Sequence, residues 1–121
     1  MKLFVFYYLP LFLYLIVVFM LNIVPVQKSF ISISNVDKLV HFLMFSILAW
    51  LCYRTLEYIH REKTPLFIPF VMLCACAVIN ESSQILIPGR HPCFYDFIAN
   101  MVGITSVFII YFIRKHTVFA K

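Results

Sequence analysis

The sequence predicts an all-α integral membrane protein, built as a bundle of four transmembrane helices with short loops. Of its 121 residues, 64% are hydrophobic and only 12% are charged, a composition far from that of soluble domains. A helix needs roughly 20 apolar residues to cross about 30 Å of hydrocarbon, and four stretches qualify, at about 3–25, 37–56, 65–87 and 94–113. Because these spans fill nearly the whole chain, we predict a single transmembrane domain over 1–121.

The first span is predicted to remain as a membrane anchor rather than to be removed as a signal peptide. Its apolar run is much longer than the roughly 7 to 15 residues of a signal-peptide core, and no small-residue cleavage site precedes Asn22. Pro25 is expected to end the helix, because proline has no N–H to donate. Asn22, one turn before that end, is predicted to act as a capping amide.

The second span begins with polar residues on one face. After a surface loop over 26–35, Ser34 or Asn35 is the predicted N-cap. Asp37 follows in the first turn, where a negative charge meets the positive end of the helix dipole. Asp37 and His41 are four residues apart and therefore lie on the same face of the helix.

The third span carries a submerged carboxylate. The connection over 54–64 is predicted to be a solvated cytoplasmic turn of mixed charge, and Pro65 is predicted to open the helix. Residues 66–79 are wholly apolar, a polar run follows, and the helix is predicted to end at Pro88 and the glycine after it. At a rise of about 1.5 Å per residue, Glu81 lies about 10 Å inside that end.

The fourth span places polar groups at a similar depth. Asp96, Asn100 and Gly103 are spaced four and three apart and share one face. Asn100 lies about 6 Å deeper than Asp96, much as His41 lies about 6 Å deeper than Asp37. Gly103 is expected to let a neighbouring helix approach closely.

The excess of basic residues indicates membrane topology. The formal net charge is +5, but the Lys and Arg residues lie at the ends of apolar spans and form no basic patch, so no nucleic-acid partner is expected. The first and third loops contain Lys28, Lys38 and Arg90. The termini and the second loop contain Lys2, Arg54, Arg61, Lys63, Arg114, Lys115 and Lys121. By the positive-inside rule, both termini are predicted to be cytoplasmic and the polar residues to lie near the extracytoplasmic side.

Two motifs resemble those of the VanZ-like membrane proteins. They are Asp37-Lys38-x2-His41-x3-Phe45 and Glu81-x2-Gln84-x5-Arg90-x5-Asp96-x3-Asn100-x2-Gly103, and the resemblance covers nearly the whole chain. It implies a compact helical protein of the bacterial cytoplasmic membrane. The family is named for a member associated with reduced susceptibility to the glycopeptide teicoplanin. This association describes a phenotype and not a reaction, so the resemblance implies a class of protein without implying an activity.

The polar residues of these spans are predicted to converge on one extracytoplasmic ligand-binding pocket, because ionisable residues inside a membrane usually face the bundle interior or a wet cavity. The alternative is a purely structural network that locks the bundle. Arg90, with Lys38, His91 and the first amides of the fourth span, is expected to cradle an anion such as a lipid phosphate. The predicted pocket residues are Asp37, Lys38, His41, Glu81, Gln84, Arg90, Asp96 and Asn100.

The predicted function is binding of a lipid or a lipid-linked cell-wall precursor head group, with a possible effect on glycopeptide access. The alternative is a small enzyme acting on a lipid-linked phosphate or ester, with Glu81 as general base and His41 as an acid–base partner oriented by Asp37. A transport role is less favoured, because residues 66–79 carry no polar stripe.

No metal and no cofactor are predicted. The set His41, Glu81, His91 and Asp96 is the conceivable metal site, but no HExxH or comparable spacing supports it. The four cysteines contain no CxxC pair, and we interpret them as small apolar residues.

Overall fold

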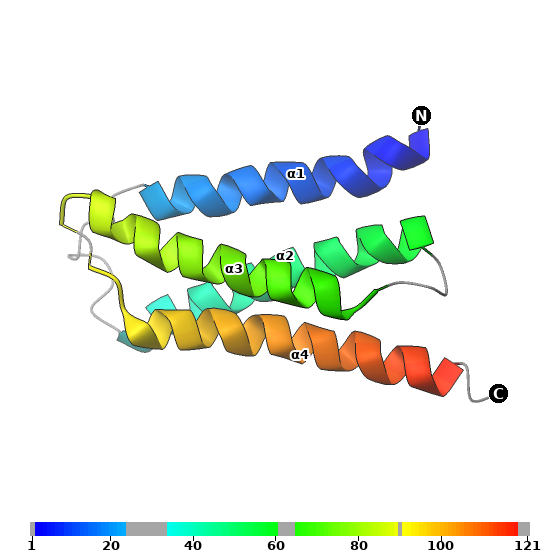
Figure 1. The fold of residues 1–121 in the computed structure, drawn as a ribbon. Coiled ribbons are helices and arrows are strands. Elements are labelled where there is room, and N and C mark those ends of the chain that lie inside the picture. The colour runs from blue at the N-terminus through cyan, green and yellow to red at the C-terminus, as the bar shows by residue number, and fades with distance from the viewer. Residues whose placement is uncertain (1, 24–33, 61–64, 90, 119–121) are drawn as a thin grey trace.

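The computed structural model describes residues 2–23, 34–60, 65–89 and 91–118, and within these ranges the regular structure is entirely helical (Figure 1). The elements are α1 (Lys2–Ile23), α2 (Ser34–His60), α3 (Phe67–Ser83), the 3-10 turn η2 (Gln84–Leu86) and α4 (Phe94–Val118). Pro25 and nearly all of the predicted loop over 26–35 lie outside the described residues, as do the side chains of Ser34 and Asn35.

Four helical segments are long and apolar enough to cross a membrane. They are Phe4–Ile23, Val36–His60, Phe67–Leu86 and Phe94–Thr117. The N- and C-termini lie at the same end of the bundle (Figure 1), as an even number of passes requires. The predicted all-α bundle with four membrane-capable helices is therefore confirmed.

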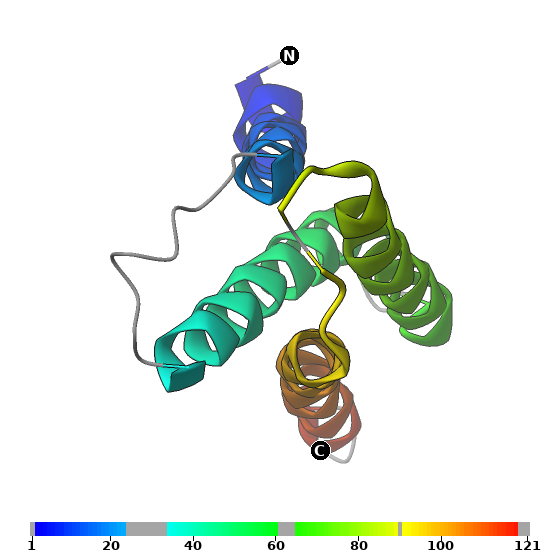
Figure 2. The same cartoon turned by 90° about the vertical axis from the view of Figure 1, so that its left-hand side faces the viewer.

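Helix α2 is the central element of the bundle. Viewed from the end, it runs between α1, α3 and α4 (Figure 2), and its most extensive interface is with α4. The buried core follows from this arrangement, because α2 contributes residues to it along most of its length. The core residues are Val18, Met44, Phe45, Leu48, Ala49, Tyr53, Leu73, Ala77 and Ile104.

Gly103 permits the close approach of α4 to α2, as its position on the polar face of the fourth span predicts. A Cβ atom at Gly103 would lie 2.5 Å from the carbonyl oxygen of Phe42 and 2.9 Å from Oγ of Ser46. Small residues at helix interfaces allow two backbones to come this close in a membrane. The same close contact brings His41, next to Phe42 on α2, within 3.2 Å of Asn100, one turn before Gly103 on α4.

The turn predicted over 54–64 is wrong in its first part, because α2 continues to residue 60; the rest of that turn lies outside the described residues. Contacts with α1 explain the longer helix. The hydroxyl of Thr55 donates to the carbonyl oxygen of Tyr7, 3.1 Å away, and the rings of Tyr7 and Tyr58 stack with centroids 4.1 Å apart. The guanidinium of Arg54 lies 4.9 Å from the ring centroid of Tyr7, a favourable cation–π distance.

Helix α3 begins and ends inside its predicted limits. It starts at Phe67 rather than Pro65, and it gives way to η2 after Ser83 instead of continuing to Pro88. Proline disfavours the helical conformation in the residue before it, and Ile87 is accordingly extended, with φ −104° and ψ 118°. The last turn tightens to 3-10 geometry, as helix ends often do.

Asn22 joins two helices and does not cap α1, so the capping prediction is wrong. Its side chain is buried, and Nδ2 donates to the carbonyl oxygen of Asn80, 3.0 Å away, and to Oγ of Ser83. These bonds attach the end of α1 to the end of α3. Most of α1 otherwise presents exposed apolar side chains.

Candidate functional site

His41 lies at the centre of a buried polar cluster formed by three helices. Its Nδ1 atom is 3.2 Å from Oδ1 of Asn100 and 3.6 Å from Oε1 of Glu81. Its Nε2 atom is 4.0 Å from Oδ1 of Asp37 and 3.9 Å from Oδ2 of Asp96. The imidazole therefore has acceptor oxygens on both of its nitrogen-bearing sides.

Helix geometry brings these side chains together. Asp37 and Asp96 each lie in the first turn of a helix, α2 and α4 respectively, where the helix dipole favours negative charge. His41 and Asn100 lie one turn further along the same two helices. Glu81 comes from the last turn of α3, just before η2. All five residues therefore lie toward the same end of the bundle.

Asn100 orients the imidazole. Its Nδ2 atom donates to Oε1 of Glu81 at 3.1 Å, so its Oδ1 atom is the one that faces Nδ1 of His41. Because an amide oxygen only accepts, Nδ1 of His41 is the donor in that contact, an assignment that follows from the hydrogen-bond network. Nε2 is then free to face the two aspartates.

Two buried carboxylate oxygens in the cluster lack a hydrogen-bond partner among the described residues. They are Oε2 of Glu81 and Oδ1 of Asp96, although Cys93 lies beside both carboxylates. Glu81 is 6% exposed and Asp96 is 5% exposed. Buried polar atoms are almost always paired with protein, water or an ion, so these two oxygens are the positions of the cluster that can accept a further hydrogen bond or ligand.

The cluster is rich in negative charge and open on one side. Asp37, Glu81 and Asp96 contribute carboxylates, whereas the nearby basic groups within the described chain are His41 and Lys38, the latter interacting electrostatically with Asp96. The side chain of Asp37 is 57% exposed. Asp37 is therefore the solvent-accessible carboxylate of the cluster, whereas Glu81 and Asp96 are buried.

The structure brings together five of the eight predicted pocket residues: Asp37, His41, Glu81, Asp96 and Asn100. Lys38 is half-buried beside them, and Gln84 is buried at the start of η2. Within the described chain, no hydrogen bond links the Gln84 side chain to the cluster. Arg90 lies outside the described residues, and with it the predicted anion cradle; His91 is exposed.

A second polar cluster was not predicted. It consists of Asn22, Asn80 and Ser83, and both side-chain atoms of Asn80 and Oδ1 of Asn22 are buried without a hydrogen-bond partner among the described residues. The available signals were the lone Asn22 near the end of the first apolar span and Asn80 at the start of the polar run of the third span. Sequence spacing cannot pair two such residues on different helices.

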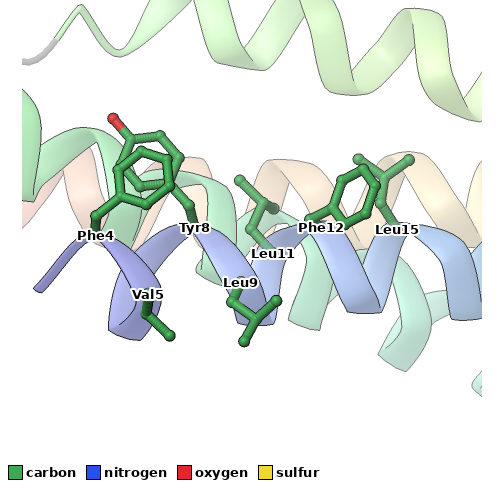
Figure 3. Close-up of a pocket in the computed structure, with 7 residues that line it drawn as sticks. All are labelled: Phe4, Val5, Tyr8, Leu9, Leu11, Phe12 and Leu15. Carbon is green, nitrogen blue, oxygen red and sulfur yellow. The ribbon is translucent and has the colours of Figure 1, made fainter. Parts of the chain in front are cut away.

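A separate, wholly apolar pocket of about 480 Å³ lies along α1 (Figure 3). It is lined by residues of this one helix alone: Phe4, Val5, Tyr8, Leu9, Leu11, Phe12 and Leu15. None of the predicted ligand-binding residues borders it. Such an apolar surface on a membrane-crossing helix suits contact with acyl chains rather than with a polar ligand.

Comparison with known proteins gives one match. A family model described as VanZ/LLP1 matches residues 2–115, which is nearly the whole chain. No curated protein and no solved structure matches the sequence.

Proposed function

This chain belongs to the VanZ/LLP1 family, and we propose that its polar cluster binds the head group of a membrane lipid or a lipid-linked cell-wall precursor. The observation that carries this proposal is the pair of buried carboxylate oxygens, on Glu81 and Asp96, that have no hydrogen-bond partner among the described residues. Hydrogen bonds between membrane helices contribute only about 0.6 kcal/mol on average. Stability alone is a weak reason to keep five polar side chains there.

The orientation of the protein supports this ligand class. Basic residues concentrate at the termini and in the second connection, so the positive-inside rule puts both termini in the bacterial cytoplasm. The His41 cluster then lies toward the extracytoplasmic face, at the depth where lipid head groups meet the bundle. Through such binding the protein would alter the access of a glycopeptide such as teicoplanin to its precursor.

The head-group proposal is tested with Glu81→Gln, which keeps the shape of the side chain and removes its charge. We expect purified Glu81→Gln protein to bind a labelled polyprenyl-linked precursor at least about tenfold more weakly than wild type, since the carboxylate would accept hydrogen bonds from hydroxyl or amide N–H groups of the head group, and losing a hydrogen bond to a charged group costs about 1.5 to 3 kcal/mol. The matched control is Glu57→Gln, because Glu57 lies near the other end of α2 and is 43% exposed. Equal precursor binding by all three proteins would contradict the proposal.

An enzymatic role is the second candidate, and one distance favours it. Oε1 of Glu81 lies 3.6 Å from Nδ1 of His41, close to the reach of a general base and its acid–base partner. In this case the substrate would be a lipid-linked phosphate or ester. Incubation of the purified protein with labelled precursor distinguishes the two roles, because an enzyme yields a changed product and a binding protein returns the lipid unchanged.

The proposed orientation predicts opposite labelling of two exposed histidines. In a background without the native cysteines, we expect a membrane-impermeant maleimide to label His91→Cys in intact cells and to leave His60→Cys unlabelled until the membrane is opened. His60 ends α2 and His91 precedes α4, at opposite ends of the bundle, and both are exposed. Labelling of His60→Cys from outside would reverse the orientation.

A further inference from the structure

We infer that Asp37, His41 and Asp96 form a binding site for a divalent cation. One ligand atom from each of these residues lies within 4.8 Å of the other two. The set differs from the metal site conceivable from sequence, since Glu81 is on the other side of the imidazole and His91 is exposed. In the proposed set Asp37 replaces Glu81 and His91 as a ligand, because it lies one helical turn from His41.

The distances fit a shared ion better than hydrogen bonds. Nε2 of His41 is 4.0 Å from Oδ1 of Asp37 and 3.9 Å from Oδ2 of Asp96, well beyond the upper limit of about 3.2 Å for a good N–H···O bond. Atoms that share an ion at about 2.1 Å lie about 3 to 4 Å apart, depending on the angle. Asp37 has an exposed side chain, so it can complete the site through a small rotamer adjustment.

The protonation of His41 suits metal binding. Nδ1 donates to Oδ1 of Asn100, which leaves the lone pair of Nε2 directed to the side of the two aspartates. A histidine ligand usually donates its other ring N–H to an acceptor that fixes the tautomer. Asn100 supplies that acceptor and is itself held by Glu81.

An independent observation also points to a cation here. Oδ2 of Asp96 faces Nε2 of His41, and the other oxygen of this buried carboxylate, Oδ1, has no side-chain hydrogen-bond partner within bonding geometry among the described residues, although Cys93 lies beside it. Two carboxylates beside an imidazole nitrogen can attract a divalent ion, and a ligand set of one nitrogen and two oxygens suits Mn²⁺ or Zn²⁺. With Asp37 exposed, the open coordination positions face the membrane surface.

The cation also resolves a conflict of charge. The phosphate of the proposed head group would be repelled by the carboxylates of Asp37 and Asp96, and a divalent ion held between these two would offset their charge and contact the phosphate. This consequence rests on the proposed function, whereas the ion site does not. The two can therefore be tested separately.

The ion site is tested on full-length protein in detergent after dialysis against EDTA. Electron paramagnetic resonance measures Mn²⁺ binding, and competition with a chromophoric chelator measures Zn²⁺ binding. We expect one ion per chain for wild type and at least tenfold weaker binding for Asp37→Asn and Asp96→Asn. Glu57→Gln is the control, because it removes a carboxylate from the same helix, α2, near its other end. Asp37→Asn keeps the test valid if Asp96→Asn fails to fold, since Asp37 is 57% exposed.

Each outcome is decisive. Loss of ion binding in the two aspartate variants, with wild-type binding in Glu57→Gln, supports the site whether or not any lipid binds. Absence of one-to-one binding of either ion, or equal binding by Asp37→Asn and wild type, overturns it. If the precursor binds equally well with EDTA and with added ion, the charge-bridging role is overturned while both the head-group proposal and the ion site stand.

Discussion

Replacement of Gly103 by alanine is expected to separate α2 from α4 and to lower the free energy of unfolding by about 1 to 3 kcal/mol, the usual cost of overpacking. The added Cβ would lie 2.5 Å from the carbonyl oxygen of Phe42 and 3.1 Å from the backbone nitrogen of Ser46. Both are backbone atoms, so no side-chain rotation relieves the clash. The helices have to move until the shortest contact reaches ordinary distances of 3.4 Å or more.

The effect of this separation extends to the polar cluster. His41 immediately precedes Phe42, and Asn100 lies one turn before Gly103 on α4. A shift that relieves a 2.5 Å contact also lengthens the 3.2 Å contact between His41 and Asn100. Gly103→Ala is therefore expected to weaken head-group binding although Gly103 touches no ligand.

The stability change is measured by unfolding in mixed micelles, followed by circular dichroism. Val102→Ile is the matched control, because it adds one methyl group to the exposed face of the same helix; Val102 is 49% exposed. We expect the control to unfold like wild type. If Gly103→Ala is as stable as Val102→Ile, the close approach at Gly103 does not limit the packing of α4.

The parts of the fold that sequence predicts are those set by local composition. Apolar runs of transmembrane length located all four helices, because the bilayer thickness imposes a length on each. Helical spacing of four and three residues likewise placed Asp96, Asn100 and Gly103 on one face of α4. Such statements need only the geometry of a single helix.

The errors in the fold came from contacts between helices. The mixed-charge segment after Arg54 has the local composition of a solvated turn, yet its described part, up to residue 60, is helical, because Tyr7 packs against Tyr58 and accepts a hydrogen bond from Thr55. Asn22 reads locally as a cap, yet it bonds the backbone of Asn80 on another helix. No spacing within one segment carries this information.

The candidate site likewise has a part that sequence predicts and a part that depends on contacts between helices. Depth estimates placed His41, Glu81 and Asn100 at similar levels, and the structure brings them within 3.6 Å of one another through Nδ1 of His41 and Oε1 of Glu81. Which nitrogen faces which oxygen depends on the rotation of each helix about its axis. The ion site of Asp37, His41 and Asp96 depends on that rotation, so it became visible only in three dimensions.

Replacement of Asn100 by leucine is expected to have the largest effect on the site. Asn100 has no exposed surface, and its side chain makes two hydrogen bonds of the cluster, one with His41 and one with Glu81. Leucine has a similar branched shape, although its two methyl groups are larger than the amide oxygen and nitrogen, and it leaves Nδ1 of His41 and Oε1 of Glu81 without their partner. An unpaired buried polar group costs about 1 to 3 kcal/mol. Two groups lose their partner, so we expect stability to fall by about 2 to 6 kcal/mol and binding of Mn²⁺ and of precursor to be at least tenfold weaker.

The tautomer of His41 shows whether Asn100 orients the imidazole ring or only stabilises the fold. In wild type the ring proton is expected on Nδ1, because Oδ1 of Asn100 accepts it, and the ¹⁵N chemical shifts of the ring report that state by nuclear magnetic resonance. In Asn100→Leu this preference is lost and the two tautomers mix, which presents a protonated Nε2 to the aspartates in part of the molecules. Ser106→Ala is the control, since its hydroxyl bonds only the Val102 carbonyl of its own helix, 2.7 Å away. If Asn100→Leu keeps the Nδ1 tautomer and wild-type ion binding, Asn100 only fills space. If the tautomer and ion binding change together, Asn100 determines which nitrogen of His41 is available to the ion.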